Sequence, residues 1–186
     1  KGIEKRIDVI ATAIKNGSNV DQLAELDLCY APPYSSAKDP VNLVAFTAQN
    51  IISGKVKVKY AHDIPKLDLK EWYILDVRTK DEREIGFIPG SHLINLDLLR
   101  KNLYRLTNKK KYLVYCASGL RSYLATPILS QNGFDAYNLS GGYDTYRNFF
   151  PDSKSEIEST EKQTQQQEIL GHDQDATITV DACGLM

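Results

Sequence analysis

The 186-residue sequence lacks several features that define major classes of protein. Its 3 cysteines are odd in number and widely spaced, which argues against a disulfide framework and favours a reducing compartment. The formal net charge is only -1, so no broad field attracts nucleic acid or anionic lipid. No apolar run approaches the roughly 20 residues of a membrane span, and residues 1–8 lack the layout of a signal peptide. We therefore expect a soluble, cytoplasmic protein with no nucleic-acid or membrane partner.

Helical patterns occupy the first 55 residues. Apolar residues recur every three or four positions over residues 3–14, which predicts an amphipathic helix that ends near Gly17. A second helix is expected to begin at Pro40, behind an acidic cap at Asp39, and to end near Gly54. Two helices enclose little apolar surface, so this part is expected to pack on something outside the chain.

From Lys57 onward, short apolar runs alternate with helical stretches, as in an α/β domain with a parallel sheet flanked by helices. Strands are expected near residues 56–58, 73–77, 92–95, 111–116 and 136–139. Helices are expected at residues 80–85, 97–106, 120–132 and 143–149.

The composition changes again after Phe150. Residues 153–167 are almost entirely polar, which is typical of a linker, and residues 176–180 alternate like a strand. The sequence therefore predicts four parts: residues 1–55, an α/β domain at 56–150, a linker at 151–175 and the start of a truncated unit at 176–186.

Cys116 follows a predicted strand and precedes a predicted helix. At the carboxyl end of a parallel strand, unpaired N–H groups and the helix dipole favour negative charge. With Arg121 nearby, the thiol pKa is expected to fall from about 8.5 toward neutrality. The alternative is a buried cysteine that only packs, because free cysteine is among the most buried residue types.

The segment Cys116-Ala-Ser-Gly-Leu-Arg-Ser122 resembles the active-site loop of single-domain rhodaneses. Residues 75–78, 86–91 and 139–143 resemble the family's Asp-Val-Arg, Gly-His-Ile-Pro-Gly-Ala and Leu-x-Gly-Gly motifs, with Phe87 in place of the usual histidine. The resemblance implies a sulfurtransferase in which Cys116 carries sulfur as a persulfide and Arg121 is the second catalytic residue.

The loop around Cys116 is expected to bind its substrate as a nest of N–H donors, in which Gly119 adopts a positive φ and Arg121 fixes loop or substrate by forked hydrogen bonds. These substrate-binding residues are Ala117, Ser118, Gly119, Leu120 and Ser122. The alternative role for Arg121 is that of a solvated charge at the start of the helix.

Two other functions are compatible with this loop. Phosphatases of the same fold have five residues between cysteine and arginine, whereas four intervene here, and the smaller cradle favours one sulfur atom over phosphate. A non-catalytic docking or dimer-bridging module is the second alternative, because folds are reused in this way.

Three other groups of polar or turn-forming residues receive structural interpretations. Asp76 and Arg78 are expected to form an ion pair or cap at a strand end, with substrate contact as the alternative. The 3 histidines lie on unrelated segments without ligand spacing, so no metal site is predicted. Gly141-Gly142 is interpreted as a tight turn before the last helix.

Residues 26–40, Leu-Asp-Leu-Cys-Tyr-Ala-Pro-Pro-Tyr-Ser-Ser-Ala-Lys-Asp-Pro, resemble the end of the dimerisation domain of flavin-dependent pyridine nucleotide-disulfide reductases, particularly the coenzyme A disulfide reductase group. The resemblance implies that Tyr30 reaches the active site of a dimer partner and donates a hydrogen bond to a thiol intermediate or to coenzyme A. Packing on the proline corner is the alternative for Tyr30 and is favoured for Tyr34. Cys29 is expected to be inert.

Residues 180–186 resemble the opening of a TusA-like sulfur-carrier domain. Together the resemblances imply a rhodanese module within an FAD- and NAD(P)H-dependent coenzyme A disulfide or persulfide reductase, with both ends of this chain cut from a longer polypeptide. No cofactor is expected in the fragment itself; FAD, NAD(P)H and coenzyme A are expected for the parent homodimer. A sulfane-sulfur donor and a thiol acceptor are the expected partners.

Overall fold

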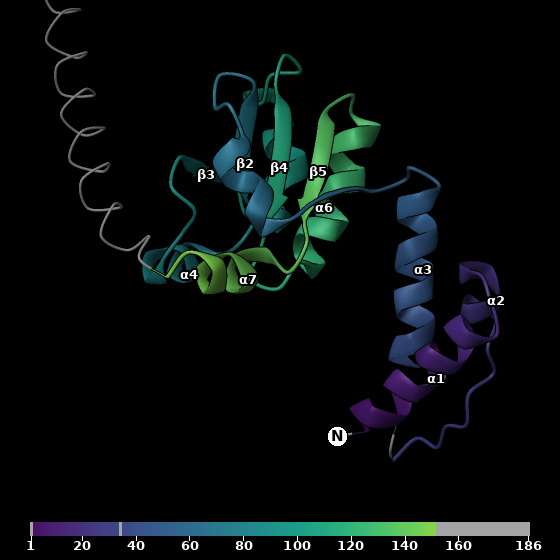
Figure 1. The fold of residues 1–186 in the computed structure, drawn as a ribbon. Helices are drawn as coiled ribbons and strands as arrows, with labels where there is room; N and C mark the ends of the chain where they lie inside the picture. Colours follow the sequence, from purple (N-terminus) through teal and green to yellow (C-terminus); the bar gives the residue numbers. More distant parts are fainter. Residues whose placement is uncertain (1, 34, 152–186) are drawn as a thin grey trace, which may run out of the picture.

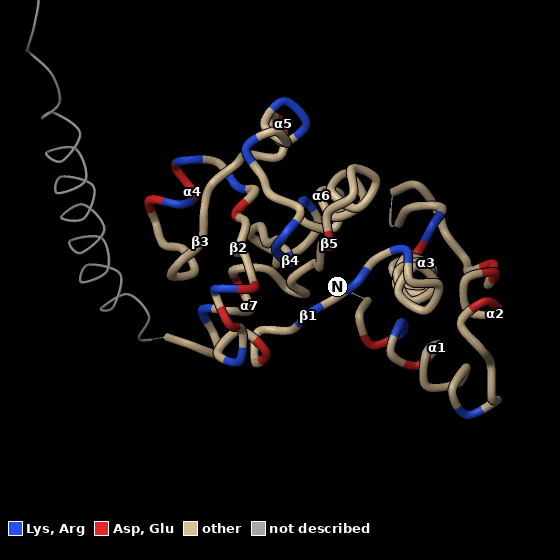
Figure 2. Tube along the Cα trace, turned by 90° about the horizontal axis from the view of Figure 1, so that it is seen from above, with Lys and Arg blue, Asp and Glu red and all other residues tan. Residues whose placement is uncertain are grey.

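The computed structural model describes residues 2–33 and 35–151, and Figure 1 shows them as a helical unit (residues 2–54) beside a sheet unit (residues 55–151). The predicted sulfur-carrier segment and residues 152–175 of the predicted linker lie outside the described residues. Within the described part of the chain, no helix is both long and apolar enough to cross a membrane. Basic and acidic residues are interspersed along both units (Figure 2).

The helical unit contains α1 (Ile3–Lys15), α2 (Val20–Ala24) and α3 (Pro40–Ile52). The predicted cap of α3 is confirmed, because the Asp39 carboxylate accepts a hydrogen bond from the Val41 amide. The same carboxylate pairs with Arg6 of α1 at 2.9 Å and so ties the two helices together. The short helix α2 was not predicted, because five residues held by the Asn19–Gln22 capping box are too few to show a hydrophobic period.

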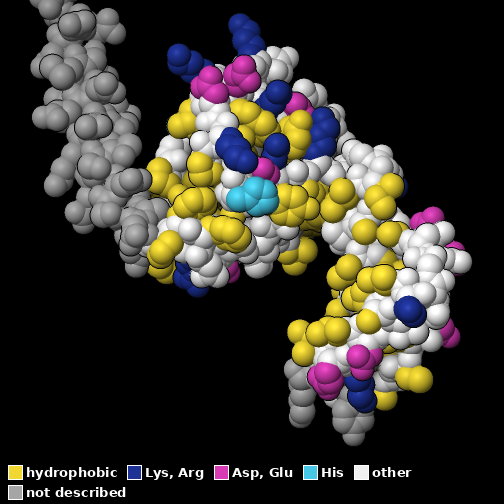
Figure 3. Space-filling view, in the orientation of Figure 1, with side chains coloured by type: hydrophobic (Ala, Val, Ile, Leu, Met, Phe, Trp, Pro, Cys, Tyr) yellow, Lys and Arg dark blue, Asp and Glu magenta, His cyan; other side chains and the backbone are white. Residues whose placement is uncertain are grey.

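The helical unit leaves much apolar surface exposed (Figure 3). On α3, a groove of about 420 Å³ is lined by Pro40, Leu43, Val44, Thr47, Ala48 and Ile51. Two isoleucines of α1, Ile3 and Ile14, are 67% and 73% exposed, so the apolar stripe that predicted this helix faces solvent instead of a core.

The sheet unit is built on five parallel strands, and the predicted α/β class is confirmed. They are β1 (Lys57–Lys59), β2 (Trp72–Asp76), β3 (Ser91–Leu93), β4 (Lys111–Tyr115) and β5 (Asp135–Leu139), in the order β1-β5-β4-β2-β3. Central β4 lies between β5 and β2 and is buried from Tyr112 to Tyr115. Register pairs Asp76 with Tyr115, so the ends of β2 and β4 meet at the same edge.

The helices of the sheet unit are α4 (Lys80–Ile85), α5 (Leu96–Leu99), α6 (Leu120–Gln131) and α7 (Gly142–Phe149), with 3₁₀ helices η1 (Ala61–Lys66) and η2 (Arg100–Arg105). The helix predicted at 97–106 is wrong in part, because it changes to 3₁₀ winding at Arg100. A helical segment this short does not show in its sequence whether it has the 3.0-residue period of a 3₁₀ helix or the 3.6-residue period of an α-helix.

Two apolar clusters cover the two faces of the sheet. One includes Val114 with Ala125 and Leu129 of α6, and the other includes Leu113 with Tyr143 and Tyr146 of α7. Alternate residues of β4 therefore face opposite clusters, as the period of a strand requires. Figure 1 shows α4 and α7 below the strands. The end of β4 is followed by a short loop into α6, and the first residues of α7 hydrogen-bond that loop.

Candidate active site

Cys116 lies immediately after β4, at the first position of the loop that leads into α6 (the cysteine loop, residues 116–122). Its side chain is buried, with 1% of the residue exposed. Two carbonyl groups of this loop are bound by the start of α7: Tyr143 N–H donates to Cys116 O at 2.8 Å, and Asp144 N–H donates to Ala117 O at 2.9 Å. These two hydrogen bonds attach the first two residues of the cysteine loop to α7, an element outside the loop.

Two glycines permit this arrangement. Gly119 has φ +105°, which confirms the predicted positive φ. Gly142 has φ +56°, and a Cβ atom there would overlap the carbonyl oxygens of Cys116 and Ala117. Gly141 and Gly142 thus form the predicted turn, and they also let α7 approach the cysteine loop closely enough to hydrogen-bond it.

Hydrogen-bond donors surround the Cys116 sulfur. Gly119 N–H donates to Sγ at 3.1 Å, and the Ser122 hydroxyl lies 3.6 Å from Sγ. Burial opposes ionisation of this thiol, but hydrogen bonds from Ser122, Gly119 and Arg121 outweigh it and lower the pKa of Cys116. The donors around Sγ therefore stabilise negative charge on this sulfur relative to an ordinary thiol.

Forked hydrogen bonds were expected from Arg121 to the loop or to substrate, and the structure has them to Glu82 of α4 instead, at 2.7 and 2.5 Å. The Arg121 side chain is thus paired with a carboxylate and 34% exposed. Glu82 is also the capping residue of its own helix and accepts from Thr79 N–H at 3.0 Å. Hydrogen bonding to Arg121 lowers the pKa of Glu82 to about 2, whereas Glu82, and less strongly Cys116, raises the pKa of Arg121. Sequence reasoning missed Glu82, although the Thr-x-x-Glu spacing marks it as a capping residue.

Asp76 and Arg78 form the predicted structural ion pair. Arg78 Nε and Nη2 donate to the two Asp76 carboxylate oxygens at 2.9 and 2.8 Å, and both residues are buried. Arg78 also donates to Gly86 O at 2.8 Å, and Tyr115 OH donates to Asp76 at 2.8 Å. This network joins the ends of β2 and β4 to α4 and positions the helix that carries Glu82.

Phe87, which stands where the resembling motif has histidine, packs under the Arg83 guanidinium with 4.0 Å between the charge and the ring centroid. Arg83 also contacts Asp76 and donates to Ser91 O at 2.7 Å. The aromatic ring therefore supports the same buried network by packing, without a polar contact of its own.

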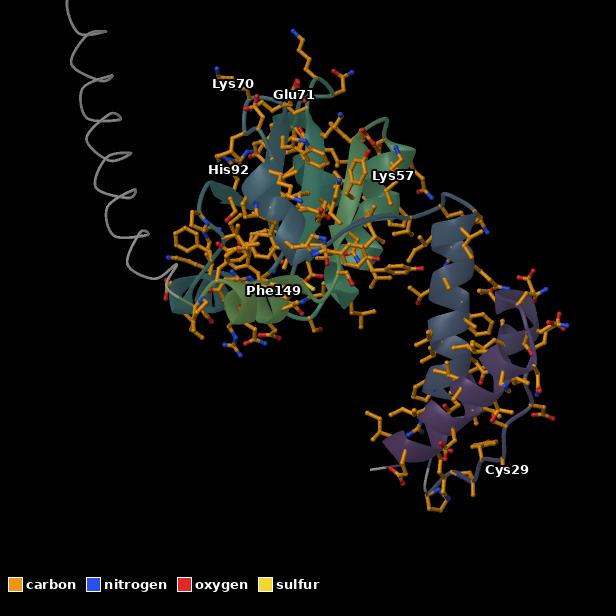
Figure 4. The ribbon with its side chains drawn as sticks, in the orientation of Figure 1. Cys29, Lys57, Lys70, Glu71, His92 and Phe149 are labelled. Carbon is orange, nitrogen blue, oxygen red and sulfur yellow. The ribbon has the colours of Figure 1, made fainter. Side chains whose placement is uncertain are left out.

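The structure brings together the predicted residues of the cysteine loop, Cys116 to Ser122, but not Tyr30. Tyr30 lies between α2 and α3 and is 50% exposed, so its contact with a partner stays a prediction. Tyr34 lies outside the described residues. Cys29 is exposed at the end of the helical unit that points away from the sheet (Figure 4).

Neither of the two histidines that the structure describes, His62 and His92, belongs to the cysteine loop. His92 of β3 stacks on Tyr73 with 4.4 Å between ring centroids, and burial lowers its pKa. Among residues 2–33 and 35–151, no group of three or more metal-ligating side chains is found.

The family model described as the rhodanese-like domain matches residues 59–149. Coenzyme A disulfide reductase of Staphylococcus epidermidis is 49% identical over 49 residues, which are 26% of this chain and 11% of that protein. The chain therefore spans only about a tenth of the curated relatives that it matches.

Two solved structures resemble both units. Reduced Bacillus anthracis CoADR-RHD has a TM-score of 0.76 and 42% identity, over 80% of this chain and 27% of that chain. The NAD-dependent persulfide reductase from A. fulgidus has a TM-score of 0.65 and 41% identity, over 75% of this chain and 25% of that chain.

Proposed function

Because residues 59–149 of this chain form a rhodanese-like domain, we propose that it is a sulfurtransferase that carries sulfane sulfur as a persulfide on Cys116. The observation that carries this proposal is the set of donors around Sγ, with Gly119 N–H at 3.1 Å. Hydrogen bonds that stabilise the thiolate also stabilise the terminal sulfur anion of a persulfide, because both place negative charge inside the same loop.

In the proposed reaction, the Cys116 thiolate attacks the outer sulfur of a donor. The new Sγ–S bond forms as the donor's own bond to that sulfur breaks, and the electron pair leaves with the donor remainder. An acceptor thiolate then attacks the terminal sulfur and releases the Cys116 thiolate. Arg121 and the loop amides bind negative charge throughout the reaction. Because only four residues lie between Cys116 and Arg121, the cysteine loop is small and favours a sulfur atom over a phosphate group.

We further propose that this module serves a coenzyme A disulfide or persulfide reductase. The support is the similarity of 49 residues of this chain to coenzyme A disulfide reductase and of both units to the two solved structures. The described residues form no nucleotide-binding domain for FAD or for NAD(P)H. We therefore assign both cofactors to the parent protein, and no step above uses them. Within a parent homodimer, exposed Tyr30 is the residue proposed to contact a thiol or coenzyme A.

Mass spectrometry after anaerobic incubation with a sulfane-sulfur donor tests the transfer. The peptide that contains Cys116 should gain about 32 Da, an adduct that dithiothreitol removes. Cys116→Ala should abolish both the adduct and turnover, whereas Cys29→Ala should leave them unchanged, because Cys29 lies in the helical unit. Absence of the adduct in the native chain, or full transfer by Cys116→Ala, would reject the proposal.

A further inference from the structure

The charge around the Cys116 sulfur is unusual for a site that handles anions. Arg121 is the only basic residue of the cysteine loop, and its guanidinium is forked onto Glu82. The thiolate and the Glu82 carboxylate therefore share one positive charge. With both ionised, these three groups sum to a net charge of about -1.

A small dianion is disfavoured at such a site. Thiosulfate carries two negative charges close to its transferable sulfur. Arg121, the one cation of the cysteine loop, is already paired with the Glu82 carboxylate. The Arg121–Glu82 pair is partly shielded from solvent, with side chains 34% and 32% exposed, so its charges are screened less than those of a fully exposed pair.

The surface beside Arg121 is apolar. Leu120 and Leu124 are 67% and 53% exposed and lie four residues apart, on one face of α6. Exposed leucines give no hydrogen bonds to an inorganic anion, but they give an apolar arm a surface to bury. Charge and surface thus favour the same kind of donor.

We propose that Glu82 is a specificity-determining residue that directs the site toward the persulfide of an organic thiol with no charge beside its sulfur and away from thiosulfate. This inference rests on the proposed sulfur transfer. The Cys116 thiolate attacks the outer sulfur of R–S–SH, the donor S–S bond breaks, and its electron pair leaves on RS⁻. The proton of the donor ends on the released thiol, RSH, and Cys116 keeps the anionic persulfide.

The substitution Glu82→Gln tests the charge of residue 82 separately from its structural role. The glutamine oxygen can still accept from Thr79 N–H and from one Arg121 N–H, which preserves the helix cap and one arm of the fork. The matched control is Glu84→Gln, on the same helix, because Glu84 pairs only loosely with Lys80 at 3.9 Å in an exposed position. Both variants remove one negative charge from α4.

The experiment measures the initial rate at which Cys116 gains sulfur from thiosulfate and from the persulfide of N-acetylcysteamine. The native chain should use the persulfide faster, and its thiosulfate rate should rise with ionic strength because screening relieves repulsion. Glu82→Gln should raise the thiosulfate rate roughly five- to tenfold at low salt, and by a larger factor than any change in the persulfide rate. Glu84→Gln should change neither.

The outcomes separate this inference from the proposed function. If the native chain takes sulfur from neither donor, sulfur transfer itself fails and the inference fails with it. If it takes sulfur but prefers thiosulfate, or if thiosulfate transfer slows with added salt, only the role of Glu82 is overturned. Equal gains in Glu82→Gln and Glu84→Gln would overturn it too. The salt dependence needs no variant, so misfolding of Glu82→Gln leaves the inference testable.

Discussion

At position 116, two opposing effects act on one thiol. Burial raises the pKa of Cys116, while the N–H groups of Ser122, Gly119 and Arg121 and the Ser122 hydroxyl lower it. The hydrogen bonds prevail because several donors converge on one sulfur atom, whereas desolvation acts once. The same residue would be an inert packed thiol without the loop that follows it.

Alkylation of Cys116 with iodoacetamide should therefore rise with pH through a midpoint below that of the same thiol in the urea-unfolded chain. The sign follows from the lowered pKa: the reactive thiolate is already present at a pH where an ordinary thiol is protonated. Ser122→Ala removes the hydroxyl 3.6 Å from Sγ and should raise the midpoint toward that of the unfolded chain.

Ser130→Ala, an exposed position at the far end of α6, is the matched control and should leave the midpoint where it is. Mass spectrometry of the Cys116 peptide follows the reaction. A midpoint in the native chain no lower than that of the unfolded chain, or the same curve for Ser122→Ala, would show that the hydrogen bonds do not lower the pKa.

Among the elements, α7 holds the cysteine loop although it contributes no side chain to the sulfur. Its first amides bind the carbonyls of Cys116 and Ala117, and Gly142 makes that approach possible. α4 acts from the other side, through Glu82 and Arg121. Two helices thus fix the loop, one through its backbone and one through a side chain.

Gly142→Ala should lower the free energy of unfolding by about 3 kcal/mol or more, because left-handed strain adds to the overlap with two carbonyl oxygens. Gly133→Ala is the matched control: it also has positive φ, +83°, but nothing lies within 4 Å of the added Cβ. That variant should lose only the strain, about 1–2 kcal/mol. Urea unfolding measures both, and equal losses would show that α7 does not need this close approach.

At the scale of the whole molecule, the helical unit and the sheet unit have separate interiors. Neither apolar cluster on the sheet includes a residue before Ile64, while α2 and α3 bury Ala24, Val41 and Ala45. The two units are joined through Asn50, whose side chain donates to Tyr123 OH at 2.6 Å and whose carbonyl accepts from Val56 N–H. The sheet unit therefore carries its own core.

Deletion of residues 1–52 should leave a sheet unit that unfolds in one transition and loses at most about 3 kcal/mol, the contribution of two hydrogen bonds. Asn50→Ala in the full chain should reproduce part of that loss, because it removes the side-chain bond to Tyr123. Leu113→Ala, in the core of β4, should cost about 2–5 kcal/mol in either form. A deletion product without cooperative unfolding would show that the helical unit completes the core.

The order of strands and helices, the end of β4 at the cysteine and the cap at Asp39 were determined by the sequence, because each depends on residues within about one turn or one strand of each other. The cysteine loop, residues 116–122, was predictable for the same reason: one short segment supplies the donors to the Cys116 sulfur.

Only the tertiary structure decided what holds that loop. Glu82 and Arg121 are 39 positions apart, and Asn50 and Tyr123 are 73 apart. Such pairs form where separate elements pack against each other, so no local period or spacing reveals them. The sequence therefore determined which thiol follows a strand and precedes a helix, and the packing of α4 and α7 around it decided the charge and the shape of its surroundings.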